Sequence, residues 1–225
     1  MRQIIFVALL AACAAAPATP ARAESGVPAV AERFVAGRHY HVFDSARPTS
    51  VAPGKIEVAE IFWYGCPHCY QLSPHVEEWN ESRPEAAELV RIPAVMNPGW
   101  HAHARLYYAT VALGIVEQTH DAIFTELHAQ RKPLNTLADM VGFLERFGVD
   151  EAAAREALTS FDVEAEVRRA DARVRGFRIS GVPAIVVNGR YVASVGSAGG
   201  HEALLELIDH LVALEAGAAS SGAER

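Results

Sequence analysis

Two cysteines separated by a proline and a histidine, Cys66-Pro67-His68-Cys69, are the residues whose types and spacing most directly indicate chemistry. Thiol–disulfide exchange needs a thiolate that attacks a disulfide and a second thiol close enough to resolve the mixed disulfide. A purely structural bridge is a weaker explanation, because so short a loop gains little closure entropy. Half of a zinc site is a further alternative, but zinc takes about four ligands and only His68 accompanies the thiols. The spacing therefore favours a redox-active pair.

The elements on either side of the pair predict different roles for its two thiols. Residues 56–63 form an apolar and aromatic run typical of a buried strand, and a helical pattern follows from Pro67. Cys66 would lie at the helix N-terminus, where unpaired backbone N–H groups and the helix dipole favour a thiolate. Pro67 suits the first helical position, His68 adds a donor and a positive charge when protonated, and Cys69 would be the buried resolving thiol. Because a stabilised thiolate stabilises the reduced protein, the disulfide is expected to be oxidising.

The N-terminal stretch is typical of an export signal. Arg2 precedes an apolar run over residues 4–16 that is too short to span a bilayer, and a small-x-small cleavage site ends at Ala23. We therefore expect residues 1–23 to be a signal peptide. The mature chain would keep only the two cysteines of the motif, in an oxidising compartment where a lone pair of cysteines is normally a disulfide.

A lipoprotein signal is the alternative interpretation of the same stretch. Residues 10–13, Leu-Ala-Ala-Cys, resemble a bacterial lipoprotein box. In that case residues 1–12 would be removed, and a lipidated Cys13 would anchor the protein to a membrane. Both alternatives place the protein outside the cytoplasm.

Strand signals occur on both sides of a long helical block. Asn188-Gly189 separates two β-prone runs, which is the pattern of a hairpin turn. The block between the strand signals has helical periodicity throughout, and Thr136 with Asp139 resembles a capping box. His101 and His103 in this block are expected to be surface residues.

Three stretches resemble the DsbA family of periplasmic disulfide oxidoreductases: residues 62–71 (FWYGCPHCYQ), residues 175–191 around Gly-Val-Pro, and the helical block between them. The resemblance spans residues 38–215 and implies an α/β, thioredoxin-like fold with an inserted all-helical domain. It implies a redox-active disulfide as the only redox group, with no cofactor and no metal. The expected organisation is a flexible lead-in (24–37), a thioredoxin-like domain (38–98 and 177–215), a helical insertion (99–176) and a disordered tail (216–225).

The resemblance also implies roles for residues outside the motif. Val182-Pro183 should be a cis peptide that faces the cysteines and helps to bind substrate, whereas the residues alone leave a trans proline open. Glu60 should be a buried carboxylate beneath the motif that relays a proton to or from Cys69. A carboxylate that faces water at a strand edge is the alternative for Glu60. Ser73 departs from the family pattern, because an acidic residue is expected at that position.

The expected activity is oxidation of other proteins. The chain would donate the Cys66–Cys69 disulfide to reduced, cysteine-containing exported proteins through a mixed disulfide at Cys66. The resemblance implies reoxidation by a quinone-linked membrane partner of the DsbB type and a periplasmic location, with the protein either soluble or anchored through Cys13. We expect a monomer, and the formal net charge of −7 at pH 7 argues against nucleic acid as a partner.

Two other functions are compatible with the motif. A disulfide isomerase or reductase would use the same thiols, although the stretch before residue 56 is expected to be too short for the dimerisation domain of DsbC-type isomerases. A metal- or peptide-binding chaperone would use the thiols or the loop at Pro183 without redox turnover. The reduction potential separates the first alternative from the oxidase, and the substitution Cys66→Ser separates the second.

Overall fold

The computed structural model describes residues 33–223 of the 225-residue chain. The predicted signal peptide, the alternative lipidated Cys13 and residues 24–32 of the predicted lead-in lie outside the described residues. Within the described range, no helix combines the length and the apolar composition that crossing a membrane requires.

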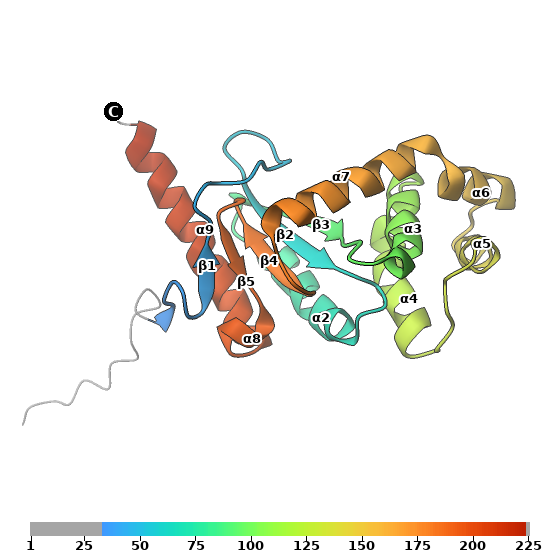
Figure 1. Cartoon of the computed structure of the whole chain (residues 1–225), viewed down its shortest axis with the longest axis horizontal. Helices are drawn as coiled ribbons and strands as arrows, with labels where there is room; N and C mark the ends of the chain where they lie inside the picture. Colours follow the sequence, from blue (N-terminus) through green and yellow to red (C-terminus); the bar gives the residue numbers. More distant parts are fainter. Residues whose placement is uncertain (1–32, 224–225) are drawn as a thin grey trace, which may run out of the picture.

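A five-stranded mixed sheet forms the centre of the molecule (Figure 1). Its strands are β1 (Tyr40–Val42), β2 (Ile56–Phe62), β3 (Ala87–Pro93), β4 (Ala184–Val187) and β5 (Tyr191–Ala193). They lie in the order β1-β5-β4-β2-β3, with β2 and β3 parallel and the other neighbours antiparallel. Every residue of β2 is buried, as the apolar run predicts for a central strand.

The turn between β4 and β5 is the predicted Asn-Gly hairpin. Asn188 and Gly189 have φ angles of 49° and 60°, the left-handed conformations that both central residues of a type I′ turn require. Gly189 is needed for a second reason, because a Cβ there would lie 2.1 Å from the carbonyl oxygen of Arg47. The start of β4 pairs with the end of β2, so the loop that precedes β4 lies beside the cysteine motif.

Helices cover both faces of the sheet, because side chains of a strand alternate between its two faces. Val58 of β2 packs with apolar side chains of α2 (Pro67–Ser82) and α9 (His201–Ala223). Ile61 packs on the other face with apolar side chains of α7 (Phe161–Phe177). The helix that carries the motif is thus fixed directly against the central strands.

Five helices lie between β3 and β4, where the sequence predicts a helical block. They are α3 (His101–Ala112), α4 (Val116–His128), α5 (Leu137–Glu145), α6 (Glu151–Thr159) and α7, and a short 3-10 turn, Pro98–Trp100, precedes them. In Figure 1, α3 to α6 form a group to one side of the sheet, and the long α7 leads back to it. Thr136 and Asp139 form the predicted capping box at the start of α5. A last short helix, α8 (Val195–Ala198), connects β5 to α9.

The predictions of a flexible lead-in (24–37) and a disordered tail (216–225) are both wrong in part. In the lead-in, Phe34 is 4% exposed, and its ring lies 5.8 Å from that of His210 in α9. The predicted tail is helical as far as Ala223. Glu215 accepts hydrogen bonds from the side chains of Asn188 at 2.6 Å and Tyr191 at 2.9 Å. These long-range contacts hold α9 on the hairpin at Glu215, the residue just before the predicted tail, and no local pattern in the Ala- and Gly-rich stretch that follows announces them.

Candidate active site

The two cysteines lie between β2 and α2, and they differ in exposure as predicted. Cys66 is the N-cap residue of α2, and its backbone N–H donates to the carbonyl oxygen of Trp63 at 2.9 Å. Cys66 keeps 8% of its surface exposed, whereas Cys69 keeps none. Both are free thiols in this structure. A reacting partner therefore reaches the sulfur of Cys66 first.

The surroundings of Cys66 favour its thiolate. They lower the pKa of Cys66 to about 6, and the largest cause is a hydrogen bond from the Cys69 thiol. The backbone N–H groups of Cys69 and His68 and the charge of His68 act in the same direction, while burial opposes them. The contact with Cys66 and burial raise the pKa of Cys69 far above its usual range. The sequence points to the helix end and His68, but the second cysteine contributes most.

We expect a pH titration of the dithiol protein to show one thiolate forming with a midpoint near pH 6, because Cys69 stays protonated there. Thiolate absorbance in the far ultraviolet measures this. Cys69→Ala removes the strongest donor and is expected to raise the pKa of Cys66 towards the usual value of about 8.5. Cys66→Ser should abolish the transition. A wild-type midpoint near that of a free thiol, or a midpoint unchanged in Cys69→Ala, contradicts this account.

The two residues between the cysteines are exposed. Pro67 is the first residue of α2, as its fixed φ and missing N–H predict. Nδ1 of His68 lies 3.4 Å from Oε1 of Gln71. The imidazole lies exposed on α2, where a partner bound to the motif would meet it.

The loop before β4 faces the cysteines. Val182-Pro183 is a cis peptide bond, which confirms the prediction and excludes the trans alternative. The Cys66 thiol donates a hydrogen bond to the carbonyl oxygen of Val182 at 3.6 Å. Both residues of this loop are only half-buried, so a polypeptide that reaches Cys66 also meets the Val182 backbone.

Glu60 lies in β2 and is 1% exposed, which confirms the prediction of a buried carboxylate. Its Oε2 is 3.5 Å from Nε of Arg91 in β3, and Arg91 also pairs with Glu77 of α2. Burial is the main reason that the pKa of Glu60 is raised to about 7, and the charge of Arg91 opposes it. The charge of Glu60 contributes to the raised pKa of Cys69. A carboxyl group that titrates near neutral pH within electrostatic reach of Cys69 suits a proton relay.

The two aromatic residues that follow β2 have different surroundings, although they lie in the turn after the strand and not in the strand itself. Tyr64 is fully buried, and its hydroxyl is hydrogen-bonded to Nδ1 of His120 at 2.9 Å. Trp63 stacks on Trp100 with ring centroids 4.3 Å apart. His103 lies against Trp63 and is 4% exposed, so the predicted surface position of His103 is wrong. The apolar face of α3 extends to this residue, and burial lowers the pKa of His103 to about 4.

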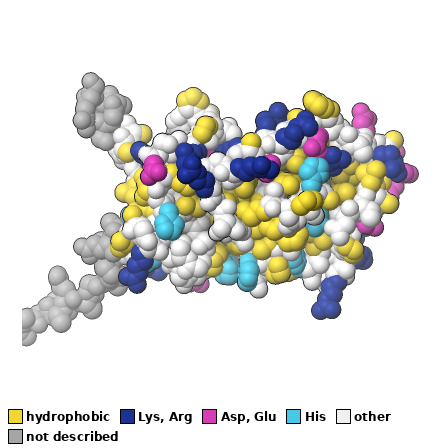
Figure 2. All heavy atoms as spheres, in the orientation of Figure 1, with side chains coloured by type: hydrophobic (Ala, Val, Ile, Leu, Met, Phe, Trp, Pro, Cys, Tyr) yellow, Lys and Arg dark blue, Asp and Glu magenta, His cyan; other side chains and the backbone are white. Residues whose placement is uncertain are grey.

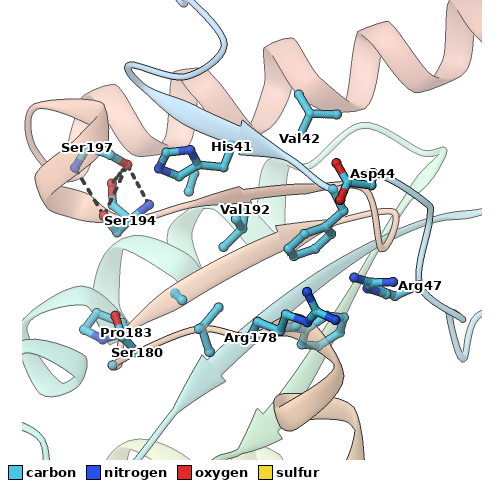
Figure 3. Close-up of a pocket in the computed structure, with 16 residues that line it drawn as sticks. His41, Val42, Asp44, Arg47, Arg178, Ser180, Pro183, Val192, Ser194 and Ser197 are labelled. Carbon is cyan, nitrogen blue, oxygen red and sulfur yellow. Dashed lines mark hydrogen bonds between the residues drawn. The ribbon is translucent and has the colours of Figure 1, made fainter.

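Two hollows meet at Pro183. One lies beside the motif, and its lining includes His68 and His201. The other extends from Pro183 across β5 to Arg47 and Arg178 (Figure 3). Figure 2 shows hydrophobic side chains gathered near the middle of the face that is turned to the viewer in Figure 1, with histidines at their border. An extended chain that passes over Pro183 would contact apolar and polar groups in both hollows.

Some residues of the site are not evident from the sequence. Arg91 is visible as a charge inside an apolar strand, but only the pairing of Glu60 with Arg91 across β2 and β3 identifies its partner. Glu77 is one of several acidic residues in α2. His201 follows a Gly-rich stretch that carries no chemical pattern.

The fold and these thiols define a class of protein. A reactive and a buried cysteine at the start of a helix, opposite a cis-proline loop on a mixed sheet, are what a thiol–disulfide oxidoreductase of thioredoxin-like fold needs. The insertion of helices between β3 and β4 narrows this class to thioredoxin-like proteins with an added helical domain.

Comparisons with known proteins identify the family. The family model described as "DSBA-like thioredoxin domain" matches residues 85–204. The thiol:disulfide interchange protein DsbA of Pseudomonas aeruginosa is 36% identical over 97% of this chain and 99% of its own length, and that of Azotobacter vinelandii is 39% identical over 96% and 98%. The crystal structure of Pseudomonas aeruginosa DsbA matches with a TM-score of 0.80 at 37% identity, covering 84% of this chain and 98% of that one. The oxidoreductase DsbA of Xylella fastidiosa matches with a TM-score of 0.76 at 31% identity, covering 81% and 98%. The chain belongs to the DsbA family of disulfide oxidoreductases.

Proposed function

We propose that this protein oxidises cysteine pairs in reduced, exported proteins by giving up its Cys66–Cys69 disulfide. The observation that carries the proposal is the opposite direction of the two pKa shifts, down for Cys66 and up for Cys69. A thiolate of low pKa is a good leaving group, and its stability favours the reduced protein, so the disulfide is a strong oxidant. The relatives are thiol:disulfide interchange proteins, which supports the same activity.

The reaction consists of two exchange steps. A substrate thiolate attacks the Cys66 sulfur of the disulfide, the S–S bond breaks, and Cys69 leaves with the electron pair and takes up a proton, for which Glu60 is the proposed donor. A second substrate thiolate then attacks the substrate sulfur of the mixed disulfide, and Cys66 leaves as a stabilised thiolate. The substrate has gained a disulfide, and the protein holds the two electrons as a dithiol.

The proposal extends to the substrate and the partners of this reaction. An extended substrate segment would lie over Pro183 and use the exposed backbone of Val182, while His68 and His201 would contact its flanks. The dithiol would be reoxidised in the periplasm by a quinone-linked membrane partner of the DsbB type. The chemistry needs no cofactor beyond the redox-active disulfide, and one copy of the chain carries every group that it uses.

The reduction potential tests the direction of electron flow. The protein is equilibrated with glutathione buffers of known ratio, and the fluorescence of Trp63 beside the motif reports the oxidised fraction. We expect a potential clearly above the value of about −270 mV for thioredoxin, because each pKa unit by which Cys66 is lowered is worth roughly 30 mV. A potential at or below that of thioredoxin, together with rapid reduction of insulin, would instead support a reductase.

A further inference from the structure

Three side chains that the thiol chemistry does not use converge where α2 packs on α4. One oxygen of Glu77, one of Asp121 and a ring nitrogen of His120 all lie within 4.8 Å of one another. Glu77 comes from α2, and the other two are neighbours in α4. Glu77 is half-buried, His120 is 2% exposed, and Asp121 lies at the surface. The cluster therefore opens to solvent on one side and has a buried imidazole on the other.

His120 is the residue that indicates a ligand. Its Nδ1 is hydrogen-bonded to the Tyr64 hydroxyl at 2.9 Å, while its buried Nε2 has no hydrogen-bond partner among residues 33–223. A buried polar nitrogen without a partner is costly. When Nδ1 carries the proton and donates it to Tyr64, Nε2 presents a lone pair. Metal-ligating histidines are held in this way, with the second ring nitrogen donating to a neighbouring oxygen.

The charges around the cluster favour a cation. Arg91 pairs with Oε1 of Glu77 and lies 3.5 Å from Glu60, so this one guanidinium serves two carboxylates. The Ser73 hydroxyl donates to Oδ1 of Asp121 at 2.9 Å and adds no positive charge. One oxygen each of Glu77 and Asp121 thus remains without these partners, beside a net negative charge. Ser73, which stands where an acidic residue was expected, orients an acid of α4 instead.

We propose that Glu77, His120 and Asp121 form a binding site for a divalent transition-metal cation such as Zn²⁺. One imidazole nitrogen and two carboxylate oxygens are ligands that zinc accepts, and they leave a fourth position for water. Tetrahedral ligands at about 2.1 Å from zinc lie about 3.4 Å apart. The ligand atoms therefore need to approach one another by roughly 1 Å. Rotamer changes of the exposed Asp121 and the half-buried Glu77 provide this movement while His120 stays fixed.

Calorimetric titration of Zn²⁺ into untagged protein with the Cys66–Cys69 disulfide formed tests this site. The disulfide form is essential, because free thiols would bind zinc themselves. We expect one Zn²⁺ per chain, with affinity weakened about tenfold or more by Asp121→Asn and by Glu77→Gln. His101→Ala is the matched control, since His101 lies 3.2 Å from Glu164 outside the cluster, and it should leave the affinity unchanged.

A second measurement keeps the test independent of folding. Co²⁺ bound to the disulfide form should show visible d–d absorption, and His120→Gln should weaken this signal even where circular dichroism shows a native fold. The proposal is overturned when the wild type binds neither metal, or when Asp121→Asn and Glu77→Gln bind as tightly as His101→Ala. The oxidation of substrate thiols is measured separately in the presence of a chelator, so a failure of the metal site does not bear on the proposed function.

Discussion

Cys69→Ala is expected to accumulate the protein as mixed disulfides with exported proteins, whereas Cys66→Ser is expected to form none. The single Cys66 thiolate in Cys69→Ala attacks a disulfide of a partner, which is the reverse of the donating step. No other thiol within residues 33–223 remains to resolve the product. The burial of Cys69 and the 8% exposure of Cys66 require this asymmetry. Non-reducing electrophoresis followed by mass spectrometry of the trapped partners measures it.

Dithiol oxidation is expected to fall about a thousandfold or more in both variants, the scale of loss when a nucleophile that acts with a partner is removed. Serine in place of cysteine changes little in volume, so Cys66→Ser is a matched control for folding. Partners trapped equally by both variants would contradict the assignment of Cys66 as the attacking residue. Full rescue of a disulfide-formation defect by Cys66→Ser would instead favour a peptide-binding chaperone.

Local sequence signals were sufficient for the elements that position the site. The apolar run of β2, the Asn188-Gly189 turn and the capping box at Thr136 each depend on residues close together in the chain, and the structure confirms all three. The order of the thiols, with Cys66 outside and Cys69 inside, also follows from local rules, because a helix N-terminus exposes its first residue. The cis peptide at Val182-Pro183 was implied only by the family resemblance.

What the sequence leaves open depends on long-range packing. The partner of Glu60 is set by the register of β2 against β3, which places Arg91 opposite it. His103 is polar by type, yet its side of α3 packs under Trp63. The main stabilisation of the Cys66 thiolate comes from the hydrogen bond of the Cys69 thiol. Only coordinates show that this bond lowers the pKa of Cys66 more than the helix N-terminus does. The first two of these features join segments whose distance no periodicity encodes.

Glu60→Gln is expected to stabilise the protein at pH 8, although it removes a carboxylate that lies beside an arginine. The folded state raises the pKa of Glu60 from 4.5 to about 7, mainly through burial and despite Arg91. Between these two values the folded state keeps a proton that the unfolded state has released. The free energy of unfolding therefore falls as pH rises through this window. The loss of stability that ionised Glu60 causes reaches its full size above pH 7. A shift of this size corresponds to roughly 3 kcal/mol.

Glutamine has the shape of a protonated glutamate and carries no charge, so Glu60→Gln should match the wild type near pH 4.5 and exceed it by about 2–3 kcal/mol at pH 8. Arg91 keeps Glu77 as a partner in this variant. Denaturant unfolding of the dithiol protein at several pH values measures the difference.

Glu57→Gln is the matched control on the same strand, and the opposite sign is expected for it. Glu57 is fully buried, but it accepts hydrogen bonds from the backbone and hydroxyl of Ser50, both at 2.7 Å, and pairs with Arg173 at 2.5 Å. Glutamine keeps only one acceptor oxygen, so either the two Ser50 donors or the Arg173 guanidinium would face an N–H₂ group and lose its acceptor, which destabilises. Two buried glutamates three residues apart would thus respond oppositely to one substitution. Loss of stability in Glu60→Gln at pH 8 would show that the charge of Arg91 outweighs burial. Glu60 would then be ionised at all physiological pH values. A carboxyl group of that kind could not deliver a proton to Cys69.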